Sequence, residues 1–346
     1  MGLAFSQIDD AVLLTQEKLV KRGAFTDMQT DLQKHVAVNE LWKGRTKQFS
    51  GGETWDFQVQ FDHNHSAAAV GLYETDGTAM TDNMATGKIE ARHVNAHYIY
   101  ELREPAFQRG GTKIVDLVKT RYTAMMVSFF TVMETFLWGK PATSADTKTP
   151  YGVDYWLTKY DSTTGFEGGN PTGFTSGKAG ISQGTYSRWA NYVDRYAAVT
   201  KADLVRKMRK AHRKTDFVSP VQHAKPTMGG NKNGIYMNET TIGLFEEEVE
   251  KQNMSLGVDI ASMDNRVTFK STPLTWVPFL DDSTDNPVFL LDWSVFAVGI
   301  MGGWQNNLTK PYMVPDKHNV RRVDLDASFN TICTDLRRQA VLNTSG

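Results

Sequence analysis

Cysteine is almost absent from this chain, because Cys333 is the single one among 346 residues. One thiol cannot build an internal disulfide framework or a cysteine-rich zinc module, which favours a protein that assembles in a reducing cytoplasm. An excess of charge of one sign is missing too, since 38 Lys and Arg face 39 Asp and Glu for a formal net charge of −1. This balance does not indicate a general nucleic-acid or membrane-surface binder.

Long apolar runs are also missing. The longest candidate begins at Tyr122 and stops at Glu134, well short of the roughly 20 residues that a membrane-spanning helix requires. The first residues, MGLAFSQIDDAVLLTQEKL, have no basic leader before an apolar core. We therefore expect neither a membrane span nor a secretory signal peptide.

Sequence signatures of common catalytic centres are scarce. No HExxH pair or paired CxxC occurs, and the acidic runs LFEEEVEK and LDDSTDN are typical of solvated faces and turns. The segment GFTSGKA departs from a phosphate-binding loop, because three residues separate Gly173 from Gly177 and Ala179 replaces the hydroxyl residue. We predict a flexible loop there, and no catalytic residue, cofactor or metal site in the chain.

Residues 1–51 are predicted to form an N-terminal arm. Within it, Ile8, Val12, Leu13 and Leu19 follow a helical spacing, with acidic residues early and basic residues late. This pattern is typical of a short amphipathic helix. The glycines of QFSGGE then interrupt the chain.

The next segment alternates between apolar and polar residues. Trp55, Phe57, Val59 and Phe61 point to one face of a predicted strand, and a second alternating run covers residues 88–102. Between them lies LYETDGTAMTDNMATGK, which is rich in turn residues. We predict an extended β-hairpin, and because an isolated two-stranded ribbon is marginally stable, it should rest on its own domain or on another chain.

Residues 112–138 predict one very long helix. Thr112 can cap its start, Asp116 lies in the first turn, and Gly139 followed by Pro141 ends it. Such a helix has about 27 residues and spans roughly 40 Å. That length is unusual for a globular domain.

The remainder indicates an α+β protein. Residues 140–184 are rich in glycine, and helices are predicted at 185–199, at 200–214 and from Asn238 onwards, with strands returning towards the C-terminus. The 200–214 helix carries seven Lys and Arg residues. Such a face can contact phosphates, although a solvated face or a subunit contact is the more usual role of a charge run.

Four histidines lie on the predicted hairpin: His63 and His65, then His93 and His97. Each pair shares one face of its strand, and zinc accepts four such ligands. No acidic residue is placed to orient the rings, so plain polar strand positions remain the simpler interpretation. A metal-dependent hydrolase that uses these histidines is kept as an alternative.

The order of these segments resembles the major capsid protein of tailed bacteriophages, the Hong Kong 97-like fold. The resemblance rests on the hairpin 54–102, the helix 112–138, the segment YWLTKYDSTTGFEGGNPTGFT…YSRWANYVDRY and the tail FLLDWSVFAVGIMGG…VRRVDLDASFNTICTDLRRQAVLN. It implies an N-terminal arm (1–51), an extended loop with the first peripheral strands (52–104), a spine helix of the peripheral domain (105–140), an axial domain (141–290), and returning peripheral strands with the C-terminus (291–346).

The resemblance also implies a structural protein without enzymatic activity. Hexamers and pentamers of the chain would form an icosahedral shell around the double-stranded DNA of a tailed phage. Assembly would take place in the host bacterial cytoplasm, with a portal, possible scaffolding or decoration proteins and weakly contacted DNA as partners, and no membrane. We predict inter-subunit contacts at Val12, Leu13, Trp55, Phe57 and Phe61. An encapsulin-like compartment shell, which shares the fold, is a second alternative.

Overall fold

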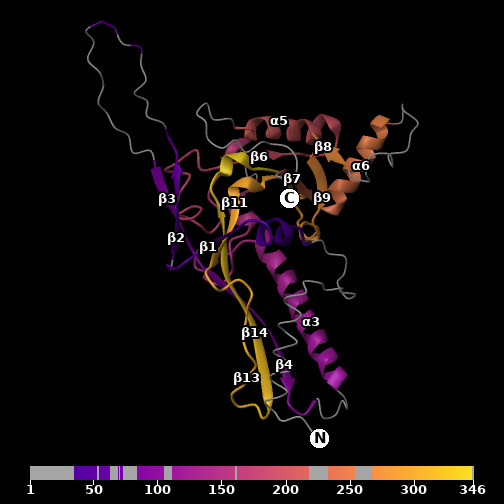
Figure 1. The fold of residues 1–346 in the computed structure, drawn as a ribbon. Coiled ribbons are helices and arrows are strands. Elements are labelled where there is room, and N and C mark those ends of the chain that lie inside the picture. Colours follow the sequence, from indigo (N-terminus) through magenta and orange to yellow (C-terminus); the bar gives the residue numbers. More distant parts are fainter. Residues whose placement is uncertain are drawn as a thin grey trace.

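The computed structural model describes residues 35–52, 54–62, 69, 71–72, 84–104, 111–159, 162–217, 233–253, 267–270 and 272–344. Figure 1 shows a broad upper part, built from a sheet and several helices, and a narrow lower part made of two long strands and one long helix. A two-stranded ribbon projects from the side of the upper part. The α+β class predicted from the sequence is confirmed.

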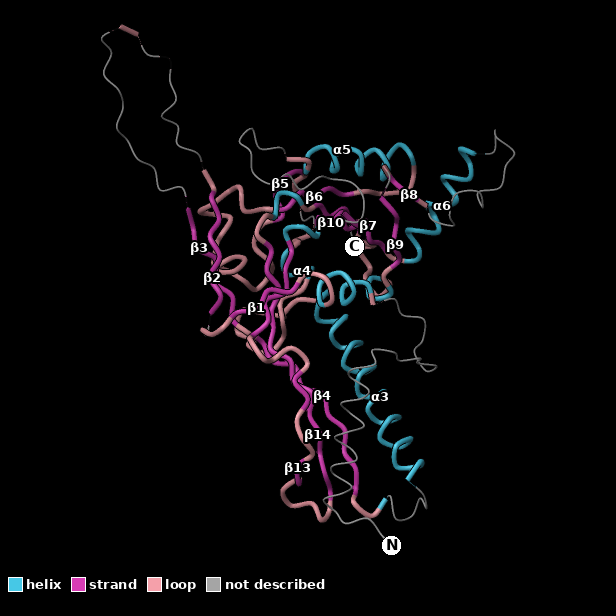
Figure 2. The backbone as a smooth tube through the Cα atoms, viewed as in Figure 1, coloured by secondary structure: helices cyan, strands magenta, loops and turns pink. Residues whose placement is uncertain are grey.

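A six-stranded sheet runs through both parts. Its central strand, β14, pairs with β4 over ten positions, from Val320 opposite Glu101 to Phe329 opposite Arg92, and further along with β11. This long ladder forms the narrow part of the molecule (Figure 2). The strands of the sheet are β1 (Thr46–Phe49), β4 (Arg92–Glu101), β11 (Phe296–Met301), β12 (Asn307–Leu308), β13 (Tyr312–Met313) and β14 (Val320–Cys333).

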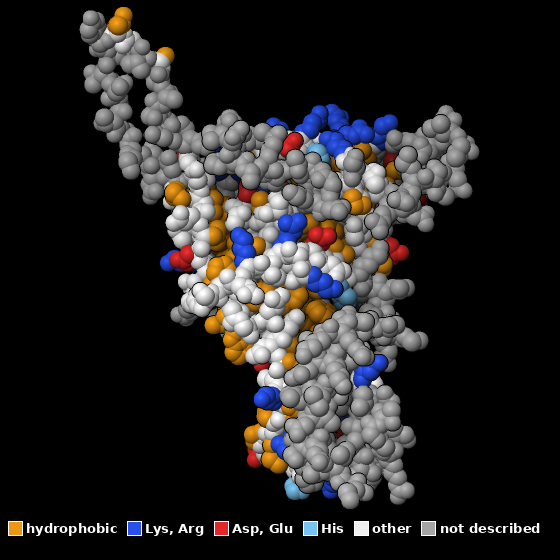
Figure 3. Space-filling model, viewed as in Figure 1, with side chains coloured by type: hydrophobic (Ala, Val, Ile, Leu, Met, Phe, Trp, Pro, Cys, Tyr) orange, Lys and Arg blue, Asp and Glu red, His pale blue; other side chains and the backbone are white. Residues whose placement is uncertain are grey.

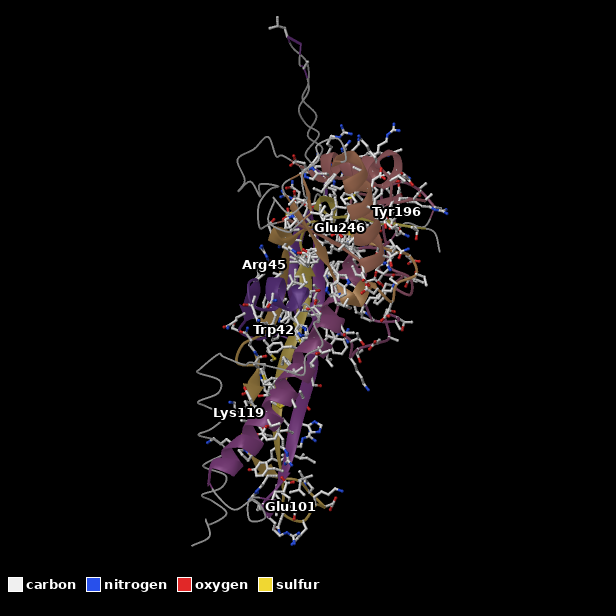
Figure 4. The ribbon with its side chains drawn as sticks, turned by 90° about the vertical axis from the view of Figure 1, so that its right-hand side faces the viewer. Trp42, Arg45, Glu101, Lys119, Tyr196 and Glu246 are labelled. Atoms are coloured by element: carbon white, nitrogen blue, oxygen red, sulfur yellow. The ribbon has the colours of Figure 1, made fainter. Side chains whose placement is uncertain are left out.

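The long helix predicted from the sequence is present as α3 (Gly111–Trp138) and lies along β4. Its buried residues recur every three or four positions and form one stripe: Tyr122, Met125, Phe129, Met133 and Leu137. Glu134 joins this helix to the short π-helix η1 (Val38–Trp42), because its carboxylate accepts hydrogen bonds from the backbone of Ala37 and Val38 at 2.9 Å each. Trp42, which is labelled in Figure 4, packs edge-on against Phe129 with ring centroids 6.5 Å apart.

A seven-stranded sheet builds the upper part. In spatial order it contains β5 (Gly165–Gly168), β6 (Asn191–Arg195), β15 (Ala340–Asn343), β10 (Val288–Asp292), β7 (Asn233–Met237), β9 (Thr272–Trp276) and β8 (Thr268–Phe269). One face is covered by η2 (Lys201–Val205), α5 (Arg206–Thr215) and α6 (Glu239–Asn253). The other face joins the main core around Trp138, Tyr236 and Trp293.

One of the predicted helices is wrong. The segment 185–199 is not a helix, because Asn191–Arg195 is β6, a strand inside the seven-stranded sheet whose first four residues are buried. The helices at 201–215 and 239–253 are confirmed, and Thr200 caps the first by accepting a hydrogen bond from the backbone of Asp203.

The predicted hairpin exists with a different second strand. β2 (Thr54–Gln60) pairs antiparallel with β3 (Met84–Glu90), from Thr54 opposite Glu90 to Gln60 opposite Met84. The alternating run 88–102 breaks near Ala91, and its larger part is β4, which pairs with β14 instead. Alternation reports which residues share a face, but it carries no information about which strand lies alongside.

Small elements complete the chain: α4 (Val153–Trp156), η4 (Pro278–Leu280), η5 (Trp293–Val295) and η6 (Leu336–Arg338). None of the helices in the described ranges is long and apolar enough to cross a membrane. The C-terminal strand β15 belongs to the seven-stranded sheet, and the domain boundaries given above stay a prediction.

Candidate assembly surfaces

The base of the β2–β3 ribbon is anchored to its own chain by aromatic side chains. Trp55 is buried and stacks on Phe49 with ring centroids 4.8 Å apart. Phe57 lies directly over Gly87, where a Cβ atom would stand 2.5 Å from the ring, so glycine is required at that position. The backbone N–H of Lys88 donates to the carbonyl of Ala179 at 2.9 Å. The first half of the ribbon is therefore part of the core.

The predicted contact residues have mixed placements. Trp55, Phe57 and Phe61 all contact aromatic residues of this chain; Phe61, for example, stacks on Tyr186 at 4.4 Å. Their contact with a neighbouring subunit stays a prediction. Val12 and Leu13 lie outside the described residues.

The glycine-rich loop beneath the ribbon is built around Lys178, whose side chain is fully buried. Its ammonium group donates to the carbonyl of Gly168 at 2.8 Å and to the Asn191 side-chain oxygen at 3.0 Å. Burial lowers the pKa of Lys178 to about 7, although the nearby Cys333 and Asp154 favour its charged form. The interpretation of this segment as a flexible loop is therefore wrong: it is a packed loop with a buried polar anchor.

Two residues after Lys178, the sequence Gly180-Ile-Ser-Gln-Gly184 matches the G-x-S-x-G pattern of a nucleophile elbow, in which a strand turns sharply into a helix. Here Ile181 forms an isolated bridge with Lys178, turns follow, and no helix begins before β6. The Ser182 hydroxyl accepts hydrogen bonds from the Asn170 side chain and from Gly184 N–H. Ser182 thus ties the loop together and lacks the setting of a catalytic nucleophile.

The histidines do not assemble into a metal site in the described part of the chain. His93 and His97 lie on the exposed face of β4, where His93 Nδ1 is 2.7 Å from the Ser328 hydroxyl and His97 is opposite Asp324. His63 and His65 lie outside the described residues. Within those ranges, no three His, Cys, Asp or Glu side chains are close enough to hold a metal ion.

The narrow part of the molecule exposes apolar side chains. Ile99 on β4 and Met313 on β13 are each 53% exposed, and Tyr312 is 41% exposed. Between β4 and α3 lies a groove of about 250 Å³, lined by Val94, Asn95, Ala96, His97, Met125, Ser128, Phe129 and Val132. Exposed apolar side chains that lie on neighbouring strands of a projecting part are typical of a protein contact surface.

The basic helix α5 presents most of its charge to solvent, and Lys and Arg side chains gather over it at the top of the molecule (Figure 3). On one flank of α5 a cleft of about 560 Å³ is lined by Thr164, Asp194, Ala202, Arg206, Lys207, Lys210 and Arg213. Lys207 donates to the Arg195 carbonyl and pairs with Asp203. The flank retains an excess of positive charge that its own carboxylates do not neutralise.

Comparison with solved structures identifies the fold. The chain is similar to the cyanophage A-1(L) capsid asymmetric unit, with a TM-score of 0.63 and 15% sequence identity over 92% of this chain and 95% of that chain. The capsid of the empty GTA particle gives a TM-score of 0.57 and 12% identity over 92% and 100%. The cyanophage Pam1 capsid asymmetric unit gives 0.53 and 10% over 93% and 95%.

No protein-family model and no curated protein matches the chain. The fold is nevertheless that of phage capsid proteins, and the Hong Kong 97-like fold expected from the sequence is confirmed. At identities of 8–15%, what these structures share with the chain is their backbone architecture.

Proposed function

We propose that the chain is the major capsid protein of a tailed bacteriophage, which self-assembles as hexamers and pentamers into an icosahedral shell around double-stranded DNA. The observation that carries this proposal is the match to phage capsid structures over 92–94% of the chain, including the full length of the chain from the empty GTA particle. A match of that extent leaves little of the chain for a separate activity.

The shape of the molecule supports the proposal on physical grounds. The projecting ribbon and the narrow part expose backbone edges and apolar residues such as Ile99 and Met313. Such features promote aggregation of an isolated monomer. Overlap with neighbouring subunits turns the same features into interface area, and interfaces repeated over many copies stabilise a shell. The near-neutral net charge suits a wall that encloses DNA without binding it tightly.

The proposed role is structural. The chain acts without a catalytic residue, cofactor or metal, resides in the virion and assembles in the host bacterial cytoplasm. Its partners are its own copies, a portal, possible scaffolding or decoration proteins, and packaged DNA in weak contact. Neither the compartment shell nor the histidine-based hydrolase has an observation in its favour.

The direct test is electron microscopy of the expressed protein, alone and together with the proteins encoded beside it. We expect closed particles with five-fold and six-fold capsomers, and phage DNA inside particles recovered from infected cells. A chain that stays monomeric at every concentration and with every such partner would contradict the proposal. Particles that enclose protein cargo in place of DNA would indicate a compartment shell.

A further inference from the structure

The helices that cover one face of the seven-stranded sheet lie towards opposite edges of it. α5 packs over β6 and β15 with η2 at its start, and α6 packs over β9 nearer the opposite edge of the sheet. Leu204 and Met208 from the first and Phe245 from the second share one core. We call the side of α5 that lines the cleft with Thr164 and Asp194, near β5 and β6, the outer flank of α5. The outer flank of α6 is the side away from Glu248, which contacts η2.

The outer flank of α5 is the basic cleft described above. Lys207 and Lys210 turn towards β6, since Lys207 reaches the Arg195 carbonyl and Lys210 lies 3.8 Å from Asp194. Arg206 and Arg213 are exposed at the rim of the same cleft. Among the residues that the structure describes, neither guanidinium has an acidic partner. Each guanidinium can therefore form a bidentate ion pair with a carboxylate of another molecule.

The outer flank of α6 carries the opposite charge. Phe245 is buried against the sheet, and Glu248 turns inward, where it accepts a hydrogen bond from the backbone of Lys201. At about 100° per residue, Glu246 lies on the other side of Phe245 from Glu248, and Glu239 lies roughly two turns below Glu246. Both glutamates are exposed. Asp281, which accepts from the Glu239 N–H at 2.8 Å, adds a third carboxylate at that end. Figure 4 views the molecule from this side and labels Glu246.

We propose that the basic outer flank of α5 docks against the acidic outer flank of α6 in a second copy of the chain, a contact that repeats head to tail around a ring. This inference rests on the proposed function, because it names the partner surface within the capsomer. Two different patches on opposite flanks of one layer make a heterologous contact, and such contacts close into rings. Opposite charges on the two flanks set the register of neighbouring copies and disfavour a reversed docking.

A nucleic acid is the other class of ligand that four clustered cations attract. It accounts for the basic flank alone, whereas a second copy uses both flanks. The net charge of −1 also means that identical copies carry little overall repulsion, while DNA meets an almost neutral molecule. The charges therefore favour a second copy of the chain.

The test is a charge swap in the full-length protein. Variant A carries Arg206→Glu and Arg213→Glu, so both outer flanks are acidic; variant B carries Glu239→Lys and Glu246→Lys, so both are basic. The control, Arg209→Glu, changes an exposed residue of the same helix that does not line the cleft. Assembled fractions are measured by sedimentation and electron microscopy, folding by circular dichroism, and binding of a short fluorescent DNA duplex by anisotropy.

We expect variants A and B each to lose at least tenfold in assembled fraction, and the control to assemble like the wild type. The chain that combines all four substitutions should recover assembly, because its flanks are complementary again. An equimolar mixture of A and B should form six-membered rings but no five-membered rings, since alternation of the two variants closes only in an even ring.

Each remaining outcome has a definite meaning. Normal assembly of A and B, or no recovery in the combined chain when its fold is intact, overturns the inference. If variant A loses DNA binding and its assembly is unchanged, the cleft is a nucleic-acid site and the inference is overturned as well. If the wild type itself never assembles, the proposed function fails first, and that failure is visible in the wild-type arm alone.

Discussion

The two sheets differ in how far one chain completes them. In the seven-stranded sheet, every residue of β10 and β15 is buried, because helices cover one face and the main core covers the other. In the six-stranded sheet, β4 alternates between buried and exposed residues out to its end, and Ile99 and Met313 remain half exposed. The comparison teaches that the chain buries both faces of the seven-stranded sheet by itself, whereas it leaves apolar side chains exposed at the end of the narrow part.

The largest effect is expected when the segment between β2 and β3 is removed. Gln60 and Met84 are paired, so an Asn-Gly turn can join them in place of residues 61–83. We expect a folded chain with a normal circular dichroism spectrum but no closed particles in electron micrographs. Phe61→Ala is the matched control for the lost packing on Tyr186, and it should assemble. Normal particles from the shortened chain would show that residues 61–83 are dispensable for assembly.

The second prediction concerns the joint between the two sheets. Trp293 is buried in η5, between β10 and β11, and its indole N–H donates to the Tyr236 hydroxyl at 2.7 Å. Trp293→Ala should lower the free energy of unfolding of the unassembled chain by about 3–5 kcal/mol. Trp304, which is 40% exposed, gives the control, and Trp304→Ala should cost less than about 1 kcal/mol. Urea denaturation measures both, and equal losses would refute the assignment of Trp293 as the joint.

The third prediction uses the buried lysine. Because the folded pKa of Lys178 is about 7 and its ordinary value is 10.5, the unfolded chain binds more protons than the folded chain between these values. This group therefore makes the protein more stable as pH rises from about 7 and less stable as pH falls through 7. Between pH 8 and 9.5 the free energy of unfolding of the wild type should gain about 1.4 kcal/mol per pH unit relative to Lys178→Met. Identical pH slopes for the two proteins would mean that Lys178 keeps its ordinary pKa.

The smallest effect on folding is expected at the exposed end of the narrow part. Ile99→Ser should change the free energy of unfolding of the unassembled chain by less than about 0.5 kcal/mol and yet reduce the assembled fraction. The same change at Ile300, which is fully buried in the same sheet, should cost about 2–5 kcal/mol. Thermal denaturation and sedimentation distinguish the two effects. An Ile99→Ser chain that assembles as well as the wild type would remove this side chain from the contact surface.

The spacing of apolar residues predicted an element correctly where that spacing alone marks the buried face of the element. The helix 111–138 was predictable because its apolar residues repeat at helical spacing and glycine and proline follow its end. The strand 54–60 was predictable from strict alternation. The prediction for 185–199 failed because residues 191–194 are buried by neighbours on both faces of the sheet, which suppresses any alternation that would mark them as a strand.

The candidate surfaces were less predictable than the elements. The seven basic residues of the 200–214 helix were visible in the sequence, but the cleft on its flank depends on Thr164 and Asp194, which come from another segment. The role of Lys178 was hidden for the same reason, because Gly168 and Asn191, which satisfy its ammonium group, are joined to it only in three dimensions. A sequence records charge and polarity, whereas burial and pairing depend on the neighbours.

By itself the sequence determined the α+β class, the long helix, the ribbon strand and the lack of an internal disulfide, because these follow from spacing and composition. Only the tertiary structure decided that residues 92–101 pair with β14, that Lys178 is buried, and that acidic and basic flanks lie on opposite sides of one helical layer. The physical reason is that strand partners and burial arise from contacts between residues far apart in the chain, and alternation along one strand is compatible with many partners.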